Sequence, residues 1–134
     1  MNVLVVDTDV VSYIFKEHPW AALYLDILED NELVISFMTR AELRLGACLA
    51  NWGARKIAAL EAHLAHYGIC FPDEGLCDLW ADVMLGAIRQ GHSMNSQDAW
   101  IAATALYLNA PLVTNNVRHF NYVKGLRVRA AATS

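Results

Sequence analysis

The sequence predicts an α/β fold: a short, mostly parallel central sheet flanked by helices, in one domain over residues 1–134. Short apolar segments alternate with longer amphipathic ones, which is typical of strands and helices that follow one another along a parallel sheet. The first segment, 3–6, is apolar throughout, as strands buried on both faces are. A chain of 134 residues, 56% hydrophobic and 18% charged, suits one domain with its own core.

The remaining elements follow in order along the chain. After the strand 3–6 we expect a helix at 10–16 and a second one that Pro19 opens and that runs to about 29, because proline suits the first helical turn. Thr39 opens the helix 39–49, and Ser96 caps the helix from 97 to about 108. Further strands are expected at 33–36, 69–71, 111–113 and 126–128, and further helices at 54–66 and 73–89.

Composition narrows the possible functions. No apolar run is long enough to span a membrane and no signal peptide follows Met1, so we expect a cytoplasmic protein. The net charge of −4 disfavours a broad nucleic-acid-binding face, although carboxylates that hold metal ions also make a chain acidic by formal count. Cys48, Cys70 and Cys77 lack metal-site spacing and are predicted to be buried thiols.

Asp7 is the first candidate functional residue. It follows the strand 3–6 directly, and functional groups of parallel sheets gather beyond the carboxyl ends of the strands. A charge there requires solvent, a partner or a metal ion. The alternative is that Asp7 caps the next helix, a role that Asp9 could also fill.

Glu42 and Asp98 are the other two candidate acids. Glu42 could form a capping box with Thr39, or lie beside Asp7, because it is one turn into a helix that follows a strand. Asp98 could be favoured in a first helical turn by the helix dipole alone. It also shares a face with Ala102 on an alanine-rich helix that could pack close to the sheet. Three converging carboxylates could hold one or two Mg²⁺ or Mn²⁺ ions for phosphodiester hydrolysis.

Four segments resemble, in order and spacing, the four motifs of the PIN-domain family, and most closely those of its VapC-type toxins. They are 5–11, 35–43 with Gly46, 98–106 and 112–120. The resemblance implies a small Mg²⁺- or Mn²⁺-dependent ribonuclease that is inhibited by a cognate antitoxin and commonly forms homodimers.

The resemblance also implies roles for particular residues. Asp7, Glu42 and Asp98 match the metal-binding catalytic acids of the family, and Thr114 and Asn116 match its polar residues after the fourth strand. His119 stands where the family usually has an acid. This departure puts a fourth carboxylate, and with it a second metal site, in question.

Several features allow more than one interpretation. Arg40, Arg44 and Arg118 could contact phosphate or be solvated surface charges. The four tryptophans could stack on bases, but core or interface packing is favoured. The apolar side chains Tyr13, Ile14, Trp20, Tyr24 and Leu28 could cover an antitoxin or dimer surface or simply pack in the core.

Two other functions compete with the ribonuclease. Asp7-Thr8-Asp9 after a strand imitates the nucleophile motif of haloacid-dehalogenase-like phosphatases, but no acid follows Asp98 to supply the late acidic pair of that family. A catalytically inactive PIN fold that binds RNA or protein is the non-enzymatic alternative, and His119 is its best support.

Overall fold

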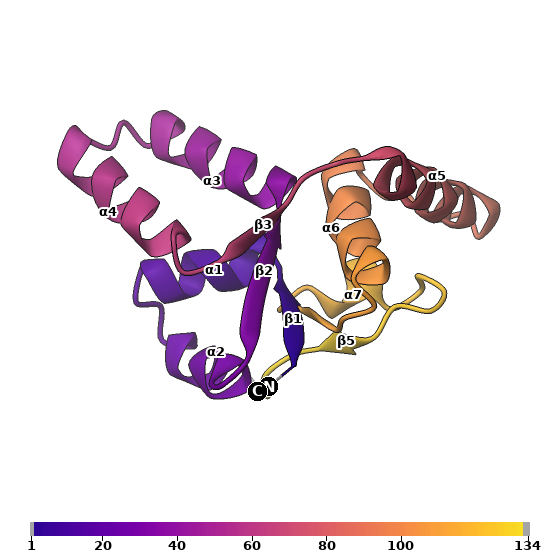
Figure 1. The fold of residues 1–134 in the computed structure, drawn as a ribbon, viewed down its shortest axis with the longest axis horizontal. Coiled ribbons are helices and arrows are strands. Elements are labelled where there is room, and N and C mark those ends of the chain that lie inside the picture. The colour runs from indigo at the N-terminus through magenta and orange to yellow at the C-terminus, as the bar shows by residue number, and fades with distance from the viewer. Residues whose placement is uncertain (1, 133–134) are drawn as a thin grey trace.

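The structure is a computed structural model that describes residues 2–132 (Figure 1). The strands are β1 (Val3–Val6), β2 (Glu32–Ser36), β3 (Gly68–Cys70), β4 (Leu112–Val113) and β5 (Val128–Arg129). The helices are α1 (Thr8–Phe15), α2 (Ala21–Leu28), α3 (Phe37–Leu49), α4 (Ala54–Leu64), α5 (Glu74–Arg89), α6 (Ser96–Tyr107) and α7 (Val117–Phe120).

The five strands form one sheet in the order β3-β2-β1-β4-β5, and every neighbouring pair is parallel. The predicted fold class is confirmed, and the sheet is entirely rather than mostly parallel. From β1 the chain adds β2 and β3 on one side and β4 and β5 on the other. The strand order therefore reverses between β1 and β4, and ligands of open α/β sheets bind at such a switch point, beyond the carboxyl ends of the strands.

Helices cover both faces of the sheet (Figure 1). The side chains of β1 alternate between two hydrophobic clusters, as the period of two in a strand requires. Leu4 and Val6 belong to a cluster with residues of α1, α2 and α4, and Val5 belongs to a cluster with residues of α5, α6 and α7. The prediction that the strand Val3–Val6 is buried on both faces is confirmed for these three residues, which are at most 1% exposed.

Several helix starts differ from the sequence-based prediction, including that of α1, which begins at Thr8 and not at residue 10. α3 begins at Phe37, because the Ser36 hydroxyl accepts a hydrogen bond from the Met38 amide at 3.1 Å and caps the helix. The alternative in which Thr39 and Glu42 form a capping box is therefore wrong. α6 is capped by Asn95, whose side-chain oxygen accepts from the Asp98 amide at 2.7 Å, and not by Ser96. α2 begins at Ala21, so that Pro19 lies in the turn before the helix.

The cysteine prediction is wrong for two of the three thiols. Cys48 and Cys77 are exposed and Cys70 is half-buried, and all three are free. Cys77 follows Leu76, which is on the buried face of α5, and one step along a helix turns a side chain about 100° away. Cys48 follows the buried Ala47 on α3 in the same way.

Three of the four tryptophans, and the apolar side chains of the first two helices, pack in or against the core, as favoured from the sequence. Trp20 and Trp52 pack against one hydrophobic cluster and Trp80 against the other. Trp100 packs on Trp80, with 5.3 Å between ring centroids. The apolar side chains of the first two helices, Tyr13, Ile14, Trp20, Tyr24 and Leu28, all join the first cluster.

Within residues 2–132, no helix has both the length and the apolar character needed to cross a membrane.

Candidate active site

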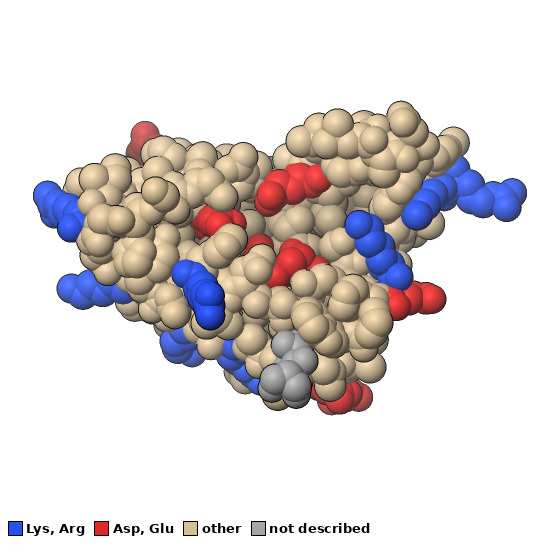
Figure 2. All heavy atoms as spheres, turned by 180° about the vertical axis from the view of Figure 1, so that it is seen from behind, with Lys and Arg blue, Asp and Glu red and all other residues tan. Residues whose placement is uncertain are grey.

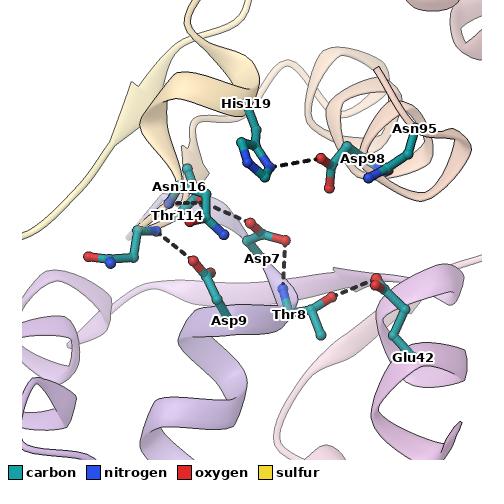
Figure 3. Close-up of polar contacts among 10 residues, drawn as sticks. Asp7, Thr8, Asp9, Glu42, Asn95, Asp98, Thr114, Asn116 and His119 are labelled. Atoms are coloured by element: carbon teal, nitrogen blue, oxygen red, sulfur yellow. Dashed lines mark hydrogen bonds and ion pairs between the residues drawn. The ribbon is translucent and has the colours of Figure 1, made fainter. Parts of the chain in front are cut away.

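A cleft of about 580 Å³ opens at the carboxyl-terminal edge of the sheet. Side chains of α1, α3, α4 and α6 line it, together with residues that follow β4. Five of the six predicted site residues line this cleft: Asp7, Glu42, Asp98, Asn116 and His119. The sixth, Thr114, is fully buried and contacts Asp7. Figure 2 shows acidic side chains gathered in a hollow on one face of the molecule, and Figure 3 shows how the site residues lie around the cleft.

Asp7 is held on both of its carboxylate oxygens. Oδ1 accepts a hydrogen bond from the Thr8 amide, and Oδ2 accepts one from the Thr114 hydroxyl, each at 2.7 Å. The Thr114 hydroxyl in turn accepts from the Asn116 amide at 3.0 Å. Asp7 is thus the N-cap of α1 and also faces the cleft. Because it is only 4% exposed, these bonds fix its orientation.

Burial and neighbouring charge raise the pKa of Asp7 to about 8. Burial is the largest cause, the charge of Asp9 adds to it, and the bonds from Thr114 and Thr8 oppose it. Asp9 accepts from the Val10 amide at 2.7 Å and from the Asn115 amide at 3.0 Å. Its pKa is also raised, again mainly by burial. A cation between these acids would relieve both the repulsion and the lost solvation.

Glu42 reaches the same cleft from the second turn of α3. Its Oε1 accepts a hydrogen bond from the Thr8 hydroxyl at 2.9 Å. The same hydroxyl lies 3.0 Å from that of Thr39. The Thr8 hydroxyl has one proton, so when it donates to Glu42 it accepts from Thr39. The buried Thr39 therefore helps to position Glu42 through Thr8, and burial raises the pKa of Glu42.

Asp98 lies in the first turn of α6, and its side chain is 19% exposed. Its Oδ2 is 3.1 Å from Nδ1 of His119, whose side chain is 55% exposed at the rim of the cleft. Burial raises the pKa of Asp98, and His119 opposes this shift. The departure from the family pattern at His119 therefore lies beside one of the predicted catalytic acids.

The donor atoms in the cleft suit a hard divalent cation. Carboxylate oxygens are the protein ligands that Mg²⁺ prefers, and four carboxylates line this cleft: Asp7, Asp9, Glu42 and Asp98. In the part of the chain that the structure describes, no three His, Cys, Asp or Glu side chains lie close enough together to hold one metal ion. The residues thus fit a cation by their chemistry, while a closed set of ligands is not preformed.

Sequence reasoning missed Asp9 as a site residue. The sequence suggests it only as an alternative helix cap, but it lines the cleft beside Asp7 and is anchored to Asn115 after β4. Asn115 itself is held by the Tyr24 hydroxyl, which donates to its side-chain oxygen at 2.6 Å. The sequence does contain an indication of this role for Asp9, because Asp9, like Asp7, closely follows the carboxyl end of β1.

The arginines considered for phosphate contact do not line the cleft. Arg40 and Arg44 both face Glu61, with N–O distances of 2.8 and 3.5 Å. Arg118 lines a smaller neighbouring pocket of about 170 Å³, which it shares with Asp98 and His119. The structure therefore favours the solvated, ion-paired interpretation for Arg40 and Arg44.

The chain is similar to known proteins in both sequence and fold. The PIN domain family model matches residues 4–126. Ribonuclease VapC1 of Haemophilus influenzae strain R2866 is 32% identical over 130 residues, which cover 93% of this chain and 95% of that protein. The structure of VapBC-1 from nontypeable Haemophilus influenzae matches with a TM-score of 0.83 and 29% identity, over 96% of this chain and 97% of that one.

A more distant structure shares the fold. VapBC-5 from Mycobacterium tuberculosis, described as a member of the VapBC family of toxin–antitoxin systems, matches with a TM-score of 0.68 and 23% identity. It covers 96% of this chain and 97% of its own. With the family match, the ribonuclease relative and the acids gathered at the edge of the sheet, this chain belongs to the PIN-domain family and, within it, to the VapC-type proteins.

Proposed function

We propose that this protein is a metal-dependent endoribonuclease, the toxin of a toxin–antitoxin pair, which hydrolyses RNA phosphodiester bonds at Asp7, Glu42 and Asp98. The observation that carries the proposal is that these acids come from three distant segments and line one cleft at the switch point of the sheet. The relative named as a ribonuclease supports RNA as the substrate. We take residues 1–134 as one PIN domain, acting in the cytoplasm, where its RNA substrate is found.

PIN nucleases of the VapC type generally depend on a metal ion, and we propose Mg²⁺ or Mn²⁺, held by Asp7, Asp98 and Glu42. Because no three of the described side chains already surround one site, these acids would hold the ion partly through water molecules, which Mg²⁺ usually keeps, or after moving closer together. When bound, such an ion supplies an activated water molecule and stabilises charge on the leaving oxygen.

The other residues of the chain orient these acids. Thr114 and the Thr8 amide fix Asp7, the hydroxyls of Thr8 and Thr39 orient Glu42, and His119 contacts Asp98. Asn116 lines the cleft with its side chain exposed, where it can donate to a phosphate oxygen or a water molecule.

Cleavage of RNA by the purified protein tests this function. We expect labelled RNA to be cut internally when Mg²⁺ or Mn²⁺ is added and to stay intact with a chelator. Mapping the new ends in total RNA would then identify the sites. RNA that is bound but never cut, with any divalent ion, would instead support the inactive binding module. Membership of the PIN family leaves no support for the haloacid-dehalogenase-like phosphatase.

We further propose two protein partners, a cognate antitoxin and a second copy of this chain. The VapBC structures support the first. The acidic cleft and the net charge of −4 suit a basic segment of the antitoxin. Large apolar side chains remain exposed on several helices, among them Leu49 of α3 at 75% and Ile88 of α5 at 66%. Exposed apolar side chains gathered on a surface mark interfaces.

A homodimer predicts a definite mass in solution. Light scattering at micromolar concentration should give twice the 14.9 kDa of one chain. Replacing Leu49 or Ile88 by glutamate, which puts a charge into an apolar contact, should shift the mass toward that of one chain if the residue lies in the dimer interface. A wild-type protein that scatters as a monomer at this concentration would contradict the dimer.

A further inference from the structure

The cleft that holds the acids is also lined by two lysines and a tryptophan: Lys16, Lys56 and Trp52. Lys16 is the C-cap residue of α1, Trp52 lies in the turn between α3 and α4, and Lys56 is in the first turn of α4. Nζ of Lys56 is 4.1 Å from the centroid of the Trp52 ring, and Nζ of Lys16 is 5.9 Å from it. Phe15 packs against the same ring, with 5.7 Å between centroids. Two cations from different helices thus meet at one half-buried aromatic ring.

The helix dipole favours Lys16, a cation at the C-terminus of α1, but no structural role of this kind accounts for Lys56. Within residues 2–132 neither forms an ion pair, whereas Arg40 and Arg44 share Glu61. Lys56 is at a helix N-terminus, where the helix dipole disfavours a cation, and no acid in that turn compensates. Of the lysines and arginines in the part of the chain described, only Lys16 and Lys56 line the cleft.

We propose that Lys16 and Lys56, positioned around Trp52, form a phosphate-binding subsite that holds the RNA backbone beside the scissile bond; this rests on the ribonuclease function proposed above. An RNA strand that enters the cleft meets Asp7, Asp9, Glu42 and Asp98, whose charges repel its phosphates. The chain as a whole is also negatively charged, at −4, so its overall electrostatic field cannot offset this repulsion. Positively charged side chains within the cleft are therefore needed to attract the phosphates.

Lysine and the shape of the cleft suit this role. A lysine binds phosphate as a point charge on a long stem, which tolerates the varied geometry of a flexible single strand. The volume of about 580 Å³ lies within the range of ligand-binding clefts, about 300–1,000 Å³. The Trp52 ring limits the motion of both ammonium groups, so that less conformational freedom remains to be given up when a phosphate binds.

The test compares variants of the full chain for binding of a fluorescent single-stranded oligoribonucleotide in the presence of a chelator, so that no cleavage intervenes. Lys16→Gln with Lys56→Gln should raise the Kd about tenfold. It should also reduce the slope of log affinity against log salt by about 0.7 for each phosphate that the protein no longer neutralises. Lys16→Arg with Lys56→Arg should retain both values, because the charge remains.

Lys124→Gln with Arg129→Gln is the matched control, since it removes the same two charges from exposed positions outside the cleft. If the lysine variant binds RNA as this control does, the subsite does not exist. If it binds RNA as the wild type does but loses affinity for a polyglutamate peptide, the lysines recognise an acidic protein segment and the proposal is overturned. A wild-type protein that cuts no RNA with added metal would contradict the proposed function instead, and the binding comparison would still decide the subsite.

Discussion

Replacing Asp7 by asparagine should abolish Mg²⁺-dependent RNA cleavage, with a loss of at least about 100-fold, while leaving the protein folded. Asparagine is as good an N-cap as aspartate, so α1 keeps its cap. Its oxygen can accept from the Thr8 amide, and the Thr114 hydroxyl can accept from its amide group. The substitution removes the negative charge that a divalent ion requires and reverses the direction of the hydrogen bond with Thr114. Cleavage rates of purified wild type and variant, at a fixed Mg²⁺ concentration, measure the effect.

The same substitution should stabilise the metal-free protein, and more so as the pH rises. The folded-state pKa of Asp7 is about 8, against 3.8 for an unperturbed aspartate, so the folded protein binds the proton more tightly than the unfolded chain does. The stabilisation from protonated Asp7 is complete below about pH 3.8 and is lost as the pH rises toward 8. Asparagine does not titrate. At pH 8 we expect a gain of about 1 kcal/mol, or roughly 3–5 °C in melting temperature for a domain of this size.

Thermal melts with and without Mg²⁺ separate the two effects. Wild type should be stabilised by added Mg²⁺, because an ion that binds only the folded state raises its stability, and Asp7→Asn should respond much less. Asp26→Asn, an exposed position on α2, is the control for a simple change of net charge. A fully active Asp7→Asn variant, or one that Mg²⁺ stabilises as strongly as wild type, would rule out Asp7 as a metal ligand.

The sequence predicted the gathering of the acids because parallel topology leaves few alternatives. The fully apolar segment Val3–Val6 is typical of a strand buried on both faces, and Asp7 follows it. The carboxyl ends of parallel strands meet at one edge of the sheet, so residues after β1 and β4 had to lie near each other. Asp7 and Thr114 are therefore joined by a hydrogen bond across 107 positions of sequence.

Short sequence motifs predicted the wrong helix cap where two nearby residues could each cap the same helix. Thr39 and Glu42 have the spacing of a capping box, but Ser36 already satisfies the helix end, which leaves Thr39 free to contact Thr8. That contact joins α1 to α3, and no pattern within either segment encodes it. The cap of α6 is Asn95 and not Ser96 for a similar reason. Both residues have good capping side chains, and the backbone conformation that the fold imposes at each position decides which of them caps the helix.

Side-chain exposure was the least predictable property. The exposed Cys48 and Cys77 sit beside apolar neighbours in sequence, yet the phase of α3 and α5 turns them outward. Lys16, Trp52 and Lys56 come together only because the turn between α3 and α4 packs beside the end of α1. Such groupings depend on how helices pack, which the spacing of residues along the chain does not determine.

His119 is the position where a substitution should strengthen the site rather than damage it. Its Nδ1 lies 3.1 Å from Oδ2 of Asp98, in the cleft that also holds Asp7 and Glu42. Replacing it by aspartate adds a carboxylate to the four that already line the cleft, at the position where the family usually has an acid. We expect Mg²⁺ affinity to rise about tenfold, the lower end of what changes around a metal ligand produce. The rate of Mg²⁺-dependent cleavage should rise with it at subsaturating metal.

His119→Asn separates charge from the mere loss of the imidazole, because asparagine matches aspartate in size and adds no charge. Titration calorimetry with Mg²⁺ and Mn²⁺ should show tighter Mg²⁺ binding for His119→Asp only. If the imidazole itself reaches the metal, both substitutions should also lower the preference for Mn²⁺ over Mg²⁺, since imidazole is the softer ligand. Without metal, His119→Asp should be the less stable variant, because two carboxylates then face each other at Asp98. Unchanged metal affinity, metal preference and pH profile in His119→Asp would place His119 outside the metal site, and its departure from the family pattern would then have no mechanistic consequence.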